Sequence, residues 1–283
     1  LLVSAGSGLV TFGRPSSAGV PAPFAELTRV LPLDDEAALD ALFAAEGSRI
    51  ATVIVEPVPA NNGLLLQRLE FLRHLRAVTA RAGALLIFDE VISGFRVARG
   101  GAAELYGITP DLATFGKILG GGMPVGAFGG RRELMRHLAP EGDVYQAGTL
   151  SGNPVAMAAG IATLGILERE RAWEKLEELG AYLEQALAPA FAAAPFPVQL
   201  VRQGSLFWMS LQAGAPPRRA DAIASGAAAL YKAIFHGLLA RGIALAPSAY
   251  EVGFLSLAHR PEHLDQLAKA LGEVFAELAG ERG

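Results

Sequence analysis

The stretch Ala84-Leu-Leu-Ile-Phe-Asp89-Glu90-Val91 places a carboxylate directly after five apolar residues. A second stretch, Thr114-Phe-Gly-Lys117-Ile-Leu-Gly-Gly-Gly-Met123-Pro124, places a lysine beside a glycine-rich turn, 28 residues after Asp89. A short apolar run bounded by polar residues predicts a strand that is buried on both faces. Burying a charge without a partner is costly, so an acid at the end of such a strand indicates either a salt-bridged residue or a binding site.

Strands and helices are predicted to alternate around these two stretches. Asp34 is a suitable N-cap for a helix through about residue 45, and the apolar run Ile50–Val55 is typical of a buried strand. Apolar residues at helical spacing follow, and Gly83 is expected to end that helix. Short strands are expected at 111–114 and 125–128, on either side of the lysine turn. This alternation predicts an α/β fold with a mostly parallel sheet and helices on both faces.

The pattern changes in the second half of the chain. Asn153-Pro154 is expected to open one long helix that runs to about residue 188. Beyond it, helices are expected near 220–240 and at 261–280, with strands at 206–211, 243–245 and 253–257. We therefore expect a large α/β domain over residues 1–165, followed by a linker helix and a smaller C-terminal α+β domain over 166–283.

Composition excludes several classes of protein. The chain has 283 residues, of which 52% are hydrophobic and 18% charged, as in globular proteins. A net charge of −4 without a basic stripe argues against nucleic acid as a partner. No apolar run reaches the length of about 18 residues that a membrane helix needs. Cysteine is absent, which fits a reducing, cytoplasmic compartment and excludes thiolate metal sites, and we expect no metal site. The start at Leu1 is typical of an internal cut, so we expect a further part of the protein upstream.

Asp89 and Lys117 are the two residues that could carry chemistry together. Pyridoxal phosphate needs an acid on its pyridine nitrogen and an amine that forms a Schiff base with its aldehyde. The chain has only four lysines, and Lys175, Lys232 and Lys269 lie in amphipathic or charged helical patterns. The glycines after Lys117 would let the backbone pass close to a flat ligand. Each residue alone also has an ordinary reading, as a strand-end cap for Asp89 and as a surface lysine for Lys117. The adjacent Glu90 should point the opposite way.

Three further segments are candidates for the same site. Gly148-Thr149-Leu-Ser-Gly-Asn153-Pro154 combines a hydroxyl with a helix start and suits either a phosphate or a simple N-cap. Asn61 could bond a ring oxygen or belong to a plain Asn-Asn-Gly turn. Glu251 lies between expected strands and by itself reads as a surface acid. Residues 1–25, rich in glycine, proline and serine, form a loop that is either mobile or a plain surface connection.

The order of these motifs resembles the class III pyridoxal phosphate aminotransferases, through essentially the whole chain. The resemblance implies the large domain of the fold type I transferases and a pyridoxal or pyridoxamine 5'-phosphate cofactor. Lys117 would hold the cofactor and move protons, Asp89 would pair its ring nitrogen, and Val91 would pack on its ring. Asn61 would contact the phenolic oxygen. Thr149, with the backbone of Gly148, would reach the phosphate of the neighbouring subunit, so a homodimer would be needed for a complete site.

Three stretches are similar to the aminomutase branch of this class: the loop Ala5…Pro21, the phrase Gly148–Gly160 and the segment Ala246–His259. That branch implies an intramolecular amino transfer that converts glutamate-1-semialdehyde to 5-aminolevulinate for tetrapyrrole biosynthesis. Residues 1–25 would be its gating loop, and Glu251 would lie near the substrate. An ω-aminotransferase with a separate oxo-acid is the closest alternative, and a ligand-binding protein without catalysis is a more distant one. The family carries an N-terminal part, with the anchor for the substrate carboxylate, that this chain lacks.

Overall fold

The computed structural model of the chain describes residues 19, 21, 23 and 26–280, which form two compact units. The first, called the α/β unit, comprises Asp35–Val58 and Gln67–Glu174. The second, called the antiparallel unit, comprises Pro59–Leu66, the chain from Lys175 onward and the described residues before Asp35. The units therefore divide within a helix at Glu174, and one short early segment joins the second unit. The expected gating loop lies, apart from three residues, outside the described part of the chain.

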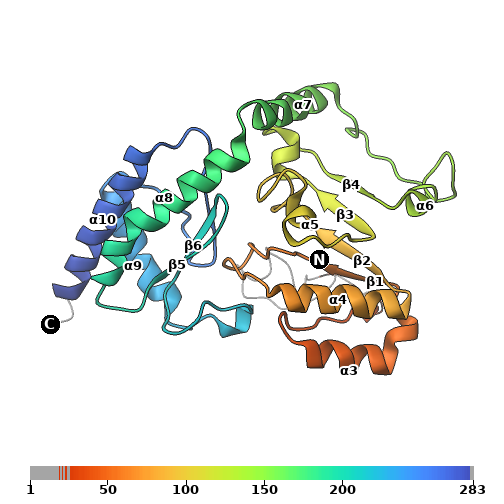
Figure 1. The fold of residues 1–283 in the computed structure, drawn as a ribbon, viewed down its shortest axis with the longest axis horizontal. Helices are drawn as coiled ribbons and strands as arrows, with labels where there is room; N and C mark the ends of the chain where they lie inside the picture. Colours follow the sequence, from red (N-terminus) through yellow and green to blue (C-terminus); the bar gives the residue numbers. More distant parts are fainter. Residues whose placement is uncertain (1–18, 20, 22, 24–25, 281–283) are drawn as a thin grey trace. The chain divides into compact units, whose positions relative to one another are not determined.

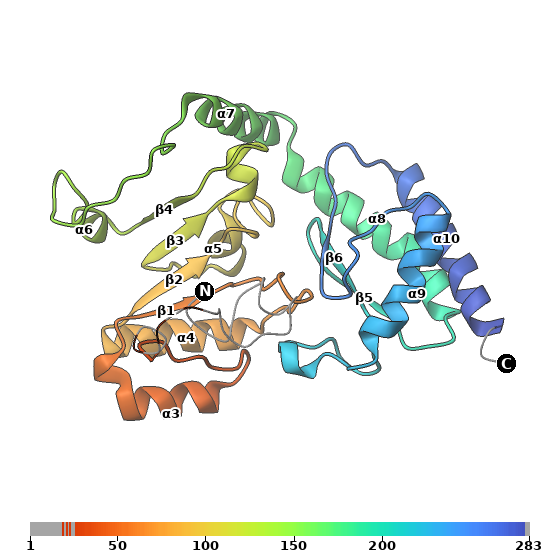
Figure 2. The same cartoon turned by 180° about the vertical axis from the view of Figure 1, so that it is seen from behind.

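The α/β unit is built on a four-stranded sheet in the order β1-β2-β3-β4 (Figures 1 and 2). Its strands are β1 (Thr52–Val55), β2 (Leu85–Asp89), β3 (Leu112–Phe115) and β4 (Ala127–Gly130). The first three are parallel, and β4 runs antiparallel to β3. The expected mostly parallel α/β sheet is confirmed. One detail is wrong: Ile54 of β1 is 60% exposed, because β1 is an edge strand of the described sheet.

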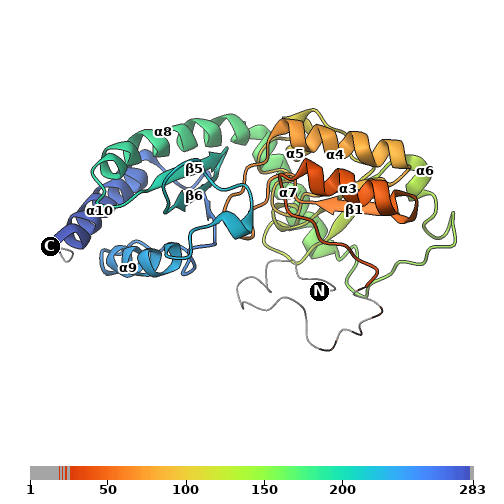
Figure 3. The same ribbon diagram turned by 90° about the horizontal axis from the view of Figure 1, so that it is seen from below.

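Helices cover this sheet. They are α3 (Glu36–Glu46), α4 (Leu69–Ala82), α5 (Gly101–Tyr106), α6 (Arg132–Met135) and α7 (Pro154–Arg169), with 3₁₀ turns η1 (Gly47–Arg49) and η2 (Lys117–Gly120). Helix α4 packs on β2, and α3 runs beside α4 (Figure 3). Gly83 ends α4 in the left-handed conformation, as the sequence predicts. Helix α3 is capped by Asp35, whose side chain accepts from the amide of Ala38, and not by Asp34.

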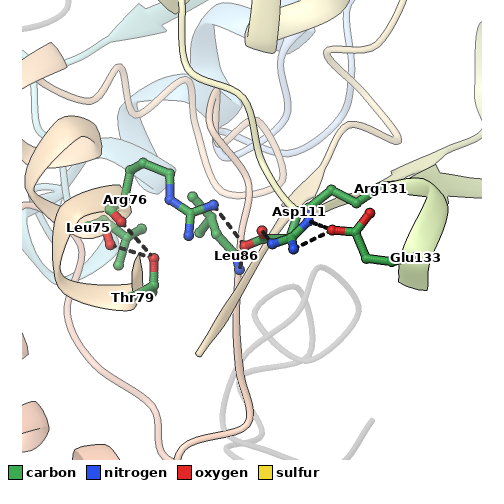
Figure 4. Close-up of polar contacts among 7 residues, drawn as sticks. All are labelled: Leu75, Arg76, Thr79, Leu86, Asp111, Arg131 and Glu133. Carbon is green, nitrogen blue, oxygen red and sulfur yellow. Dashed lines mark hydrogen bonds and ion pairs between the residues drawn. The ribbon is translucent and has the colours of Figure 1, made fainter. Parts of the chain in front are cut away.

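Asp111 joins three elements of the α/β unit (Figure 4). Asp111 is only 5% exposed, and its carboxylate accepts a hydrogen bond of 2.8 Å from the amide of Leu86 in β2. Arg76 of α4 and Arg131, just after β4, each donate to a different carboxylate oxygen at 2.8 Å. Two arginines and a backbone amide thus compensate the loss of water around a buried charge. This cluster holds the start of β3 against its neighbours.

The described part of the antiparallel unit contains the smaller sheet β5-β6-β7 and three helices. Its elements are α8 (Ala172–Ala192), β5 (Gln199–Gln203), β6 (Leu206–Ser210), η3 (Ala220–Ala222), α9 (Ala227–Ala240), β7 (Gly253–Phe254) and α10 (Pro261–Gly280). Every residue of β6 is buried. Arg202 of β5 pairs with two glutamates of α8, while α9 packs against α10, so the sheet lies between α8 and α9 (Figure 3). The expected smaller α+β domain has this core.

Three expectations for the second half of the chain are wrong in detail. The long helix after Asn153-Pro154 is two helices, because Arg171 adopts a left-handed φ of 52° between α7 and α8. Residues 243–245 form no strand, and the sequence missed β5. The strand expected at 253–257 is only two residues long. Among the described residues, no helix is long and apolar enough to cross a membrane.

Candidate active site

Asp89 ends β2 at the carboxyl edge of the sheet. It pairs in register with Thr114 of β3, whose hydroxyl donates to Oδ1 of Asp89 at 3.3 Å. The amide of Val91 donates to the same oxygen at 3.1 Å. Oδ2 has no hydrogen-bond partner among the described residues, and the side chain is half-buried. The arrangement therefore leaves one carboxylate oxygen available to a donor such as a protonated ring nitrogen.

Lys117 begins η2, three residues beyond Thr114 on the neighbouring strand. Its backbone has a φ of 47°, a conformation that costs a residue other than glycine about 1–3 kcal/mol and that is concentrated at functional sites. All four lysines have exposed side chains, so exposure does not distinguish Lys117 from Lys175, Lys232 and Lys269, which lie on α8, α9 and α10. The backbone conformation does distinguish it.

Val91 brings the turn after β2 against the turn that carries Lys117. A Cβ added at Gly116 would lie 3.4 Å from the side chain of Val91. Since β2 and β3 are parallel, the residues that follow them meet at one edge of the sheet. The structure therefore brings Asp89, Val91 and Lys117 to the same edge of the sheet, a placement that the sequence predicts for Asp89 and Lys117. Thr114, which sequence reasoning missed, belongs with them, and only its register opposite Asp89 identifies it.

Among the glycines after Lys117, Gly121 packs against a neighbouring helix. A Cβ at Gly121 would lie 2.5 Å from the carbonyl oxygen of Ala159 in α7, and Gly121 has a φ of 58°. A Cβ at Gly160 of α7 would clash with the carbonyl of Leu119 in η2. These two glycines let the lysine turn pack directly on α7.

The loop before α7 carries Gly148 and Thr149. Both are exposed, and the amide of Ser151 donates to the carbonyl of Gly148 at 2.9 Å. The side chain of Asn153 accepts from the first amides of α7, at 3.0 and 3.2 Å, and is thus the N-cap. Thr149 is one tight turn away from this cap, with its side chain open to solvent.

Asn61 and Glu251 belong to the antiparallel unit, in two segments that are bonded to each other. The amide of Gly63, two residues after Asn61, donates to the carbonyl of Tyr250 at 2.6 Å. A Cβ at Gly63 would lie 2.8 Å from the indole of Trp208, whose Nε1 donates to Ala249 at 2.8 Å. The segments of Asn61 and Glu251 therefore meet around one buried indole. Asn61 is half-buried and Glu251 is exposed.

A small cavity of about 30 Å³ lies beside Glu251, which is room for about one water molecule. Tyr231 also lines it and donates to the carbonyl of Ala246 at 2.6 Å. Burial, together with the nearby carboxylate of Glu251, raises the pKa of Tyr231 to about 12. Tyr231 is thus held as a neutral hydrogen-bond donor.

Two histidines close to this segment have the spacing of a His-x-x-x-His pair. His259 and His263 are four residues apart, and their ring centroids are 6.2 Å from each other. Nδ1 of each ring accepts a backbone amide, from Ser256 and Arg260 respectively. Within the described part of the chain no group of three or more potential metal-binding side chains occurs.

Known proteins share this fold and much of this sequence. The sequence profile of the family "Aminotransferase class-III" matches residues 10–273. The chain belongs to the class III aminotransferase family. Its relatives include proteins named glutamate-1-semialdehyde 2,1-aminomutase. That of Bdellovibrio bacteriovorus is 50% identical over 96% of this chain and 64% of its own length. That of Neisseria gonorrhoeae is 51% identical over 99% and 65%. The chain thus spans just under two thirds of these relatives.

Two solved structures with the same fold have names that state different activities. An ω-transaminase from Sphaerobacter thermophilus has a TM-score of 0.86 and 31% identity, over 93% of this chain and 60% of its own. A glutamate-1-semialdehyde-aminomutase from Pseudomonas aeruginosa PAO1, in complex with PMP, has a TM-score of 0.80 and 26% identity, over 93% and 60%.

Proposed function

We propose that the protein containing this chain uses a pyridoxal phosphate cofactor to convert glutamate-1-semialdehyde to 5-aminolevulinate, in tetrapyrrole biosynthesis. The single observation that carries the cofactor assignment is the carboxyl edge of the sheet, where Asp89 ends β2 with one carboxylate oxygen that has no partner among the described residues, and where Lys117, with its left-handed φ, follows the neighbouring strand β3. The donor set fits the group, because it offers one carboxylate for a ring nitrogen and one amine for an aldehyde. The relatives that are about half identical support the choice of substrate.

The cofactor, when bound, supplies an electron sink for carbon–hydrogen bonds next to an amine. Asp89 would then hold the proton on the ring nitrogen, and Thr114 and the Val91 amide would keep its carboxylate in place. Val91 would support the ring through its apolar side chain. Lys117 would anchor the aldehyde and afterwards carry a proton between two carbon atoms. Asn61 would donate to the phenolic oxygen, and Glu251 would lie near the substrate.

The test of the cofactor site is reduction of the intact protein with borohydride, followed by peptide mass spectrometry. We expect the reduced cofactor on Lys117 alone. A Lys117→Ala variant is expected to lose aminolevulinate formation by about three orders of magnitude or more, since both anchoring and proton transfer disappear. Lys232→Ala, an exposed lysine of α9, is the matched control and should keep full turnover. Label on another lysine, or undiminished turnover of Lys117→Ala, would contradict the proposal.

A homodimer is the second part of the proposal. Gly148 and Thr149 lie on an exposed loop, so they are available to a phosphate held by a neighbouring subunit. Mixed dimers of Lys117→Ala and Thr149→Ala test this sharing. If each site takes its lysine from one subunit and its threonine from the other, half of the sites in a hybrid are intact. Random mixing should then restore about a quarter of the wild-type sites. Activity no higher than the average of the two variants alone would refute sharing.

An ω-aminotransferase with a separate oxo-acid acceptor is the second candidate. It is favoured by the ω-transaminase fold match, whose TM-score of 0.86 exceeds the 0.80 of the aminomutase structure. Turnover that requires added pyruvate or 2-oxoglutarate would establish it. Turnover of glutamate-1-semialdehyde without any added oxo-acid would exclude that requirement.

A further inference from the structure

Glu90 carries a buried carboxylate that the proposed function does not use. Its exposure is 1%, and it points away from the half-buried Asp89 that precedes it. Oε2 accepts from the hydroxyl of Ser93 at 2.8 Å and from the amide of Ala102 at 2.7 Å, and Oε1 accepts from the amide of Ala103 at 3.0 Å. No cation among the described residues pairs with it, unlike Asp111. Within the described part of the chain, only neutral donors therefore contact this carboxylate.

The turn between β2 and α5 is built around Glu90. Its backbone amide donates to the carbonyl of Thr114 at 2.9 Å, and its carbonyl accepts from Gly94 at 2.8 Å. A Cβ at Gly94 would lie 2.6 Å from that carbonyl oxygen, and a Cβ at Gly101 would clash with the carboxylate. Two glycines are therefore required for the chain to close around this one residue.

This closed turn determines where two residues of the proposed cofactor site lie. Val91 follows Glu90 directly and donates its amide to Asp89, and a Cβ added at Gly116, just before Lys117, would lie 3.4 Å from the Val91 side chain. If the carboxylate of Glu90 lost its donors, these hydrogen bonds would no longer fix the conformation of the turn after Asp89. We infer that Glu90 is a positioning residue that keeps the Asp89 carboxylate and Val91 in place for the cofactor, an inference that rests on the proposed function.

The experiment compares the intact wild-type protein with Glu90→Gln, which keeps the shape but replaces one acceptor oxygen with a donor. The first measurement is amide hydrogen exchange over residues 91–103 without cofactor, where we expect faster exchange in the variant. The second is the pH titration of the absorbance of bound pyridoxal phosphate, together with its dissociation constant. We expect the titration midpoint to move by about one pH unit and the dissociation constant to rise about tenfold.

Glu104→Gln is the matched control. Glu104 is an exposed acid of α5, the short helix whose first amides donate to Glu90, and its carboxylate accepts from the amide of Gly100 at 2.7 Å. It has no bond to the residues that hold Asp89, so its spectrum and cofactor affinity should equal those of the wild type. Ser93→Ala removes one of the three donors to Glu90 and keeps the charge. It should shift the titration in the same direction by a smaller amount, and it serves if Glu90→Gln does not fold.

The possible outcomes separate the inference from the proposed function. Faster exchange with an unchanged titration and affinity would make Glu90 a structural residue only and would overturn the inference. Unchanged exchange in both Glu90→Gln and Ser93→Ala would also overturn it. A wild-type protein that binds no borohydride-reducible cofactor would refute the proposed function first, and the inference with it. A shifted titration in the variants, beside a normal wild-type and Glu104→Gln, supports both.

Discussion

Replacing Asp111 with asparagine is expected to destabilise the α/β unit by about 2–4 kcal/mol. Asparagine keeps the shape and one acceptor oxygen, but it removes the charge that faces Arg76 and Arg131 and turns an amide group toward one of three donors. Breaking a buried ion pair costs about 3–5 kcal/mol, and a lost hydrogen bond to a charged group about 1.5–3 kcal/mol. The side chain of Arg131 is 49% exposed and can regain water. The expected loss of unfolding free energy therefore lies below the upper end of the range for a buried ion pair.

The difference in stability between the wild type and Asp111→Asn should also depend on pH. Burial by itself raises the pKa of Asp111, but the hydrogen bonds from Leu86, Arg131 and Arg76 outweigh it, so the pKa is lowered. The folded pKa thus lies below the unfolded value of about 3.9, and the stabilising contribution is present above that value and lost as the pH falls through the folded pKa. The difference between wild type and variant should therefore be constant near neutral pH and shrink in acid.

The assay is the urea dependence of amide hydrogen exchange in β2 and β3, which reports on the α/β unit by itself. It is run at about pH 7 and about pH 3 for the wild type, Asp111→Asn and the control Glu133→Gln. Glu133 pairs with Arg131 at the solvent-exposed side of the cluster, so its removal should change little. A loss below about 0.5 kcal/mol at neutral pH, or a gap that is equal at both pH values, would refute the reasoning.

Substitutions at two further sites, one in each unit, test packing and a buried hydrogen bond. Gly121→Ala should lower the melting temperature more than Gly122→Ala. Both glycines have a positive φ, but only at Gly121 would the added Cβ lie 2.5 Å from a backbone atom of α7. Equal melting temperatures of the two variants would contradict this. Tyr231→Phe should cost about 1 kcal/mol at about pH 8, because a buried hydrogen bond to Ala246 disappears. With its pKa raised to about 12, the tyrosine stabilises the fold fully below its unfolded pKa of about 10, so the gap to Phe should close between about pH 10 and 12 in urea titrations.

Features that depend on neighbouring residues in the chain were predictable. Gly83 ends α4, Asn153 caps α7, and the apolar run before Asp89 forms β2. Each follows from a local cause, namely a left-handed φ, a side-chain acceptor at a helix start, or an unbroken apolar run. The motif order that indicates the family is likewise a property of the chain alone.

Features that depend on distant partners were not predictable. Strand β5, Gln199–Gln203, has polar residues at both ends and forms because it pairs with β6. Residues 243–245 are apolar but follow a left-handed turn at Gly242 and pair with no strand. Arg171 interrupts a sequence that otherwise suits one helix. For β5, pairing with a distant strand overrides the local preference, while the positive φ at Arg171 and Gly242 ends a local pattern that would otherwise continue.

The sequence by itself determined which side chains could do the chemistry: an acid after a buried strand, and one lysine of four beside a glycine turn. It could not decide what two adjacent acids do. Asp89 and Glu90 carry the same charge, and alternation says only that they point to opposite sides. The tertiary structure decides the rest, because Thr114 lies opposite Asp89 at the open edge of the sheet, while the amides of α5 enclose Glu90. Burial and donors come from segments distant in the chain, and on them rest the proposals that Asp89 belongs to the cofactor site and that Glu90 supports it.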